Sequence, residues 1–226
     1  MILTQKTMKI TKKYNLPKGY LSYSAIMLWL RSPEMYRRRY YENEEQQESI
    51  PMKFGKTIAT VFQSRDFKDF PALRKVPYYP VSEQQIIVDV DGVEVKAYLD
   101  LWNPATLSIG EVKTGYISTK TGPPWDKVKV RKHEQLPFYS FLAKKMYGKV
   151  DPIVHLIWLE TKYRSIEEQV GSRVLEGEGQ ELELTGKIEI FERRIAEWER
   201  ARIKALILAA AAAISKDYDY YLKHKN

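Results

Sequence analysis

The sequence contains no cysteine among its 226 residues. Disulfides, thiolate zinc sites and iron–sulfur clusters are therefore excluded, and the absence is usual for a cytosolic protein. No apolar run approaches the roughly 20 residues that cross a bilayer. The longest candidate, ALILAAAAAI at 205–214, favours a packed helix, and the N-terminal residues lack the apolar block of a secretory signal. We therefore expect a cytoplasmic protein without a membrane partner.

Basic residues are in excess, with 37 Lys and Arg against 29 Asp and Glu, which gives a net charge of +8. Such a surplus favours an anionic partner, commonly nucleic acid, although many soluble proteins carry it without one. Hydrophobic residues at 44% and charged residues at 29% are typical of a folded chain. The length predicts a single domain over 1–226, with 1–20 as an N-terminal extension.

The hydrophobic pattern predicts an α/β fold, in which helices flank a central mixed β-sheet. Asp91 and Gly92, between two alternating runs within 84–102, form a strong hairpin signal, and the run at 106–113 extends the hairpin to an antiparallel meander. The continuous apolar run at 152–163 is typical of a central strand that is covered on both faces. The remaining predicted elements are a short strand at 180–184 and helices at 21–41 (with a break near Pro33), 52–64, 129–147 and 188–222.

Two carboxylates and a lysine lie near the ends of neighbouring predicted strands, in the stretches YLD and GEVKTG. Because side chains alternate along a strand, Glu111 and Lys113 share a face, and Asp100 lies beside them if the turn near Pro104 sets that register. Converging carboxylates suit Mg²⁺ or Mn²⁺, and a lysine stabilises charge on a phosphate. The trio fits phosphodiester hydrolysis. The alternative is a surface salt bridge between Glu111 and Lys113, with Asp100 as a strand-end cap.

The predicted helix at 129–147 carries a second set of polar residues. Gln135 and Tyr139 are four residues apart, so a helix presents both on one face, and Arg131 one turn earlier could contact a phosphate. Pro137 removes one helical hydrogen bond, so the helix either starts later or kinks there. The alternative is an ordinary, partly buried helix face.

Three consecutive arginines lie between tyrosines at the end of the first predicted helix. This mixture of cations and stacking rings suits a nucleic-acid strand, and the alternative is a solvated helix end. The Lys-rich region 113–132 adds further candidates. The predicted DNA contacts are Arg37, Arg38, Arg39, Tyr40, Lys120 and Arg131.

Taken together, these motifs resemble the PD-(D/E)xK nuclease superfamily, in particular its RecB-like branch, which includes CRISPR-associated exonucleases and phage recombination nucleases. LSYSAIMLWLRSPEMYRRRY looks like the opening helix of the family, FGKTIA falls at its G-x-x-[IV]-H helix, and HEQLPFY supplies its Q-x-x-x-Y element. The resemblance covers residues 21–163 and implies a restriction-endonuclease-like core, with which a long C-terminal helix is compatible.

The resemblance also implies roles for individual residues. Asp100, Glu111 and the backbone carbonyl of Val112 would hold Mg²⁺ or Mn²⁺, Lys113 would be the catalytic lysine, and Gln135 and Tyr139 would complete the catalytic set. The implied activity is hydrolysis of DNA, as an exonuclease of phage type, in DNA processing or recombination. Besides DNA, a helicase, a recombinase or a single-strand-binding protein is a candidate partner.

The chain departs from the family at two positions. Ser32 replaces a cysteine of the opening helix, which removes the iron–sulfur cluster of one subgroup. Ala59 stands where the metal-binding histidine is expected, four residues after Gly55. Three explanations stay open: a water replaces the ligand and Mn²⁺ is preferred, the chain is a non-catalytic DNA-binding or assembly module, or it is an engineered inactive variant. An RNA-directed endonuclease would keep the same chemistry on another substrate.

Overall fold

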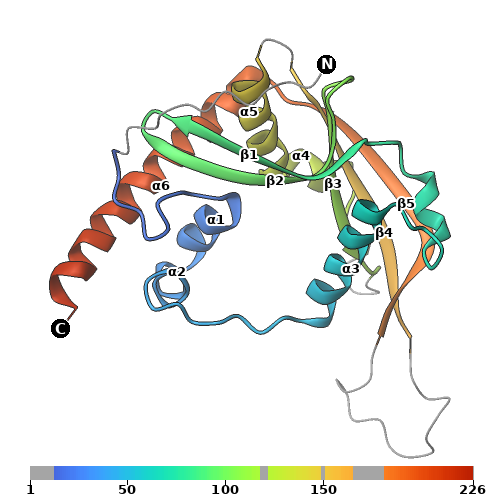
Figure 1. Ribbon diagram of the computed structural model, residues 1–226, viewed down its shortest axis with the longest axis horizontal. Helices are drawn as coiled ribbons and strands as arrows, with labels where there is room; N and C mark the ends of the chain where they lie inside the picture. Colours follow the sequence, from blue (N-terminus) through green and yellow to red (C-terminus); the bar gives the residue numbers. More distant parts are fainter. Residues whose placement is uncertain (1–12, 118–121, 149–150, 165–180, 226) are drawn as a thin grey trace, which may run out of the picture.

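The computed structural model describes residues 13–117, 122–148, 151–164 and 181–225, in which helices flank one β-sheet (Figure 1). The helices are α1 (Tyr23–Arg31), α2 (Pro33–Tyr40), α3 (Ile50–Ser64), the 3-10 helix η1 (Pro71–Lys75), α4 (Lys127–Lys132), α5 (Gln135–Tyr147) and α6 (Glu197–His224). The strands are β1 (Val81–Val90), β2 (Val93–Asn103), β3 (Ser108–Gly115), β4 (Ile153–Arg164) and β5 (Glu181–Arg194).

The sheet is mixed and has the strand order β1-β2-β3-β4-β5. Strands β3 and β4 are parallel, and the other neighbours are antiparallel. The crossover from β3 to β4 carries α4 and α5, because parallel neighbours need a long connection. Asp91 and Gly92 both have positive φ, 52° and 89°, as a two-residue hairpin turn of type I′ requires. The predicted hairpin and meander are confirmed.

Helices cover both faces of the sheet and bury two sets of apolar side chains. On one face, Ile26 of α1 and Ile207 of α6 are buried, together with residues of α5. On the other face, α3 contributes Ile58 to a second cluster. Strand β4 supplies Leu156 to the first cluster and Ile157 to the second, as a strand covered on both faces should. The predicted mixed sheet with flanking helices is therefore confirmed.

The first predicted helix is divided at Ser32, which ends α1 and caps α2. The Ser32 hydroxyl accepts a hydrogen bond from the N–H of Met35 at 3.3 Å, and Pro33 occupies the first helical position, where its missing N–H costs nothing. At the start of α1, the Ser22 hydroxyl accepts from the N–H of Ala25 at 3.3 Å. The break expected near Pro33 is confirmed.

The prediction of one helix over 188–222 is wrong at its start. Strand β5 continues to Arg194, and α6 begins at Glu197. Residues 187–190 alternate charged and apolar side chains, and residues 188–194 pair with β4, so strand pairing decides their conformation. The predicted strand at 180–184 is the first part of this longer strand. Gly186, with a φ of 87°, lies where the register with β4 shifts.

The C-terminal helix α6 is 28 residues long, and Figure 1 shows it running across the sheet toward α2. Its buried residues Ile203, Ile207, Ala210 and Ile214 recur every three or four positions, which is the period of a one-sided apolar stripe. The long C-terminal helix expected from the sequence is present. Within the described parts of the chain, no helix is both long and apolar enough to cross a membrane.

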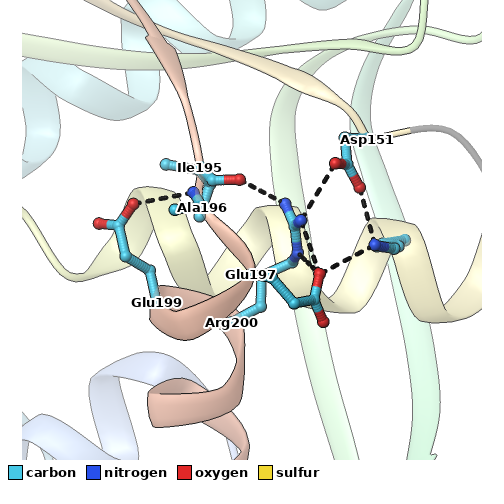
Figure 2. Close-up of polar contacts among 7 residues, drawn as sticks. Asp151, Ile195, Ala196, Glu197, Glu199 and Arg200 are labelled. Atoms are coloured by element: carbon cyan, nitrogen blue, oxygen red, sulfur yellow. Dashed lines mark hydrogen bonds and ion pairs between the residues drawn. The ribbon is translucent and has the colours of Figure 1, made fainter.

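A buried arginine fixes the corner between β5 and α6 (Figure 2). Arg200 donates to the carbonyl oxygen of Ile195 at 2.6 Å and forms ion pairs with Glu197 at 2.8 Å and Asp151 at 3.1 Å. These partners satisfy a guanidinium that would otherwise be costly to bury. They also connect the start of α6 to the segment that precedes β4.

Candidate active site

Strands β2 and β3 separate where the two carboxylates lie. Their ladder ends at the pair of Leu101 and Gly110, and the next positions are Asp100 and Glu111. There the N–H of Val112 donates to Asp100 Oδ2 at 2.8 Å, so a carboxylate takes the place of a backbone acceptor. The register thus places Asp100 beside Glu111, at the open end of the ladder.

Lys113 connects this end of the sheet to α5. Its Nζ lies 2.5 Å from Glu111 Oε1 and donates to Gln135 Oε1 at 3.0 Å. In turn, Gln135 Nε2 donates to Tyr139 Oη at 2.7 Å. The two α5 side chains, one turn apart, therefore hold the lysine through a continuous line of hydrogen bonds.

The Glu111–Lys113 pair differs from an ordinary surface salt bridge. Glu111 is 1% exposed, and Asp100 is partly buried. Burial raises the pKa of the Asp100 carboxyl well above its usual value, and the neighbouring charge of Glu111 raises it further. Burial also raises the pKa of Glu111, against the opposing effect of Lys113. A hydrogen bond from Asp100 lowers the pKa of Glu111, so of the two carboxyl groups it is Asp100 whose charge the pair disfavours.

This donor set fits a hard divalent cation. Glu111 Oε2 is buried without a hydrogen-bond partner, and leaving such an oxygen unpaired costs about 1–3 kcal/mol. A Mg²⁺ or Mn²⁺ ion would satisfy that oxygen and remove the repulsion from Asp100. Among the residues that the structure describes, no three candidate ligands already lie close enough together to form a metal-binding group.

Two adjoining cavities share the site residues Asp100, Lys113 and Gln135. The first, the α3 cavity, has a volume of about 400 Å³, lies against α3, and is also lined by Ala59, Glu83 and Glu111. The second, the tyrosine cavity, has a volume of about 670 Å³ and is also lined by Tyr20, Tyr40, Tyr98, Tyr139, Lys18 and Lys96. Asp100 therefore borders both cavities, whereas Glu111 borders the α3 cavity.

Position 59 lines the same cavity as the two carboxylates. Ala59 is partly buried on α3 and lines the α3 cavity with Asp100, Glu111 and Val112. Its methyl group offers no ligand to a cation. The cavity therefore lacks a donor on its α3 side at this position.

The predicted arginines of α2 fall into two groups. Arg37 donates twice to Asp217 of α6, at 2.9 and 2.5 Å, and Arg38 donates twice to Glu44, at 2.6 and 2.7 Å. These two guanidinium groups are thus engaged within the chain. Arg39, which donates to a glutamine side chain at 2.6 Å, lines the tyrosine cavity together with Tyr40.

Arg131 does not share a helix face with Gln135, so that prediction is wrong. Helix α4 ends at Lys132 and α5 begins at Gln135, where a single helix over 129–147 was expected. Arg131 lines a different hollow, beside Trp198. Pro137 has no N–H to donate, and it lies in the first turn of α5, where backbone N–H groups have no partner within the helix. This position explains why α5 starts later than the predicted helix. Lys120 lies outside the described residues.

Two features of the site did not emerge from the sequence: Glu83, and the cavity tyrosines Tyr20 and Tyr98. Glu83 lines the α3 cavity and has a φ of 53°. A signal for Glu83 was present, because a two-residue turn at Asp91 and Gly92 sets position 83 opposite Asp100. Tyr98 also had a signal, because it lies two residues before Asp100 on β2 and alternation sets both on one face. No comparable local signal marks Tyr20, which approaches the site through tertiary packing.

The fold is similar to that of solved exonuclease structures. For a putative exonuclease from Eubacterium rectale the TM-score is 0.53 at 12% identity, over 92% of this chain and 88% of that one. For a phage-related exonuclease from Haemophilus somnus 129PT the TM-score is 0.53 at 10% identity, over 87% and 82%. No protein-family model and no curated protein matches the sequence. At these identities the likeness shows an exonuclease-like fold.

Proposed function

We propose that this chain is a metal-dependent nuclease of the PD-(D/E)xK type, RecB-like, that removes nucleotides from DNA ends in DNA processing or recombination. The observation that carries the proposal is the buried pair of Asp100 and Glu111, with one unpartnered carboxylate oxygen beside Lys113. The exonuclease-like fold supports it. We also propose that 1–226 is one nuclease domain.

Each residue of the site has a separate role in the proposed hydrolysis. Asp100, Glu111 and the carbonyl oxygen of Val112 would hold Mg²⁺ or Mn²⁺, which supplies a polarised phosphate oxygen and a more acidic bound water. Lys113 holds a positive charge where attack on phosphorus develops negative charge. Gln135 fixes the direction of Lys113, because its amide oxygen accepts from Nζ.

The tyrosine cavity supports a path for the DNA strand. Lys96 Nζ lies 4.5 Å from the ring centre of Tyr20, and Lys18 Nζ lies 5.1 Å from that of Tyr40. Bases stack on such rings and phosphates pair with such cations, with little sequence preference. A strand in this cavity would present a phosphodiester to Asp100 and Lys113, which line it.

End-labelled linear DNA, incubated with Mg²⁺ or Mn²⁺, tests the proposal. We expect the wild-type chain to shorten the DNA. Asp100→Asn should slow cleavage at least about a hundredfold, the size of the loss when one electrostatic group leaves an active site. The control Asp69→Asn makes the same change at an exposed position and should cleave like wild type. Equal rates for Asp100→Asn and wild type would contradict the proposed site.

The second candidate function, a non-catalytic DNA-binding module, is favoured by Ala59, since this residue leaves a ligand position empty of donors. It predicts that the affinity for DNA changes neither with divalent metal nor with Asp100→Asn. If the wild-type chain binds DNA but cleaves it with neither metal, the binding module replaces the nuclease.

A further inference from the structure

Three acidic residues form a row across the sheet at the site. The β1–β2 pairs on either side place Glu83 directly opposite Asp100. The last β2–β3 pair places Asp100 next to Glu111. All three side chains line the α3 cavity. The row therefore extends the carboxylate pair by one residue, contributed by β1.

The position of Glu83 is unfavourable in the metal-free protein. Like charges opposite each other on neighbouring strands destabilise a sheet. Burial and the charge of Asp100 both raise the pKa of Glu83. Its φ of 53° is also rare for a residue with a side chain, and such strain gathers at functional sites. A cation near the row would offset the repulsion.

An independent observation points to a ligand in the same cavity. Glu111 is 1% exposed, and its Oε2 atom has no hydrogen-bond partner. Lys113, the cation beside Glu111, bonds the other oxygen, Oε1. The chain thus leaves one buried oxygen of the row available for a further positive group.

We propose that Glu83 contributes to metal binding through a water of the ion, so that a carboxylate on β1 partly compensates for the ligand that Ala59 does not supply from α3. The proposal rests on the proposed function. Mg²⁺ is usually held by one or two carboxylates and keeps several waters. Asp100 and Glu111 would be the direct ligands, and the Glu83 carboxylate would accept a hydrogen bond from a water of the ion.

Binding of Mn²⁺ alone tests the proposal without reference to cleavage. The full chain is titrated with Mn²⁺, and the free ion is measured by electron paramagnetic resonance. Glu83→Gln should raise the Kd about tenfold or more, the usual cost of losing an outer-shell partner. Glu94→Gln, on the same hairpin opposite Asp89, is the matched control and should bind like wild type. Adding Ala59→His to Glu83→Gln should recover affinity.

Thermal unfolding separates this role from a structural one. Glu83→Gln removes a like charge facing Asp100, so the Tm without metal should not fall, while the rise in Tm caused by Mn²⁺ should shrink. Glu83→Asp keeps the charge and should retain more of the rise in Tm caused by Mn²⁺. This variant provides the test if Glu83→Gln folds poorly.

The outcomes distinguish two failures. If Glu83→Gln binds Mn²⁺ like wild type while Asp100→Asn does not bind it, the role of Glu83 is overturned and the nuclease site stands. If the wild-type chain does not bind Mn²⁺ even in the presence of DNA, both proposals fail.

Discussion

At the scale of single residues, a substitution at Ala59 should raise metal affinity and the rate of DNA cleavage the most. It lies on α3, partly buried, and lines the cavity that holds Asp100 and Glu111. Ala59→His places a neutral imidazole, a good ligand for Mn²⁺, on the side of the cavity that lacks a donor. We expect the Kd for Mn²⁺ to fall about tenfold, which corresponds to about 1.4 kcal/mol, and DNA cleavage to accelerate.

The control for this variant is Thr60→His. Thr60 is the next residue of α3 and is exposed, so its imidazole would face water. It should leave both the Mn²⁺ affinity and the cleavage rate unchanged. An equal gain from the two variants would indicate nonspecific binding of the ion by imidazole and would contradict the placement of residue 59 at the site.

The sequence predicts the centre of the site because local rules govern it. Alternation along β3 sets Glu111 and Lys113 on one face, and helical spacing sets Gln135 and Tyr139 one turn apart. Glu83 was missed because one acidic residue in a polar strand resembles an ordinary exposed residue. Its proposed role depends on the hairpin register, which the turn at Asp91 and Gly92 signals, and on the left-handed backbone at position 83, which no local pattern indicates.

At the scale of elements, the errors lie at boundaries. Residues 187–194 carry helix-forming charged residues, yet pairing with β4 makes them a strand. The single helix expected over 129–147 is interrupted between Lys132 and Gln135, which moves Arg131 away from the site. In the first case strand pairing outweighs local propensity, and in the second the local effect of Pro137 sets where α5 begins. The hairpin and the central strand were predicted well, because a turn signal and a continuous apolar run determine them locally.

One carboxylate joins two elements that are distant in sequence. Asp217 of α6 accepts hydrogen bonds from Arg37 at 2.9 and 2.5 Å and from Tyr41 Oη at 2.9 Å. Asp217→Asn should lower the free energy of unfolding by about 1–2 kcal/mol, since charged hydrogen bonds to a partly exposed group are lost. Urea denaturation measures the difference. Asp219→Asn is the control, because an amide oxygen can still accept from Asn15.

The effect of Asp217→Asn should depend on pH. The hydrogen bond from Arg37 is the main cause that holds the pKa of Asp217 below its usual value. The unfolded chain therefore takes up a proton at higher pH than the folded chain does. The stability from Asp217 is complete above the unfolded pKa, about 3.9, and is lost as the pH falls through the lower folded pKa. The difference between wild type and variant should shrink below about pH 4; a difference independent of pH would contradict this assignment.

At the scale of the whole molecule, the net charge of +8 is an incomplete guide to DNA binding. Arg37 and Arg38 pair with Asp217 and Glu44, so part of the basic surface of α2 is neutralised within the chain. Arg39 donates to the neutral side chain of Gln46 and lines the cavity that contains Asp100. For DNA binding, the position of each basic residue relative to the site should therefore matter more than the total charge of the chain.

Salt titrations of DNA binding test this point. Fluorescence anisotropy of a labelled single strand, with EDTA to prevent cleavage, gives the affinity at several salt concentrations. The logarithm of the association constant should fall linearly with the logarithm of the salt concentration, because phosphate contacts release counterions. Arg39→Gln should weaken binding and reduce the slope by about 1, as expected for one lost phosphate contact. Arg131→Gln removes the same charge from the hollow beside Trp198 and should leave the slope unchanged. The reverse result would place the strand along α4 and β5, away from the tyrosine cavity, and would separate DNA binding from the carboxylates altogether.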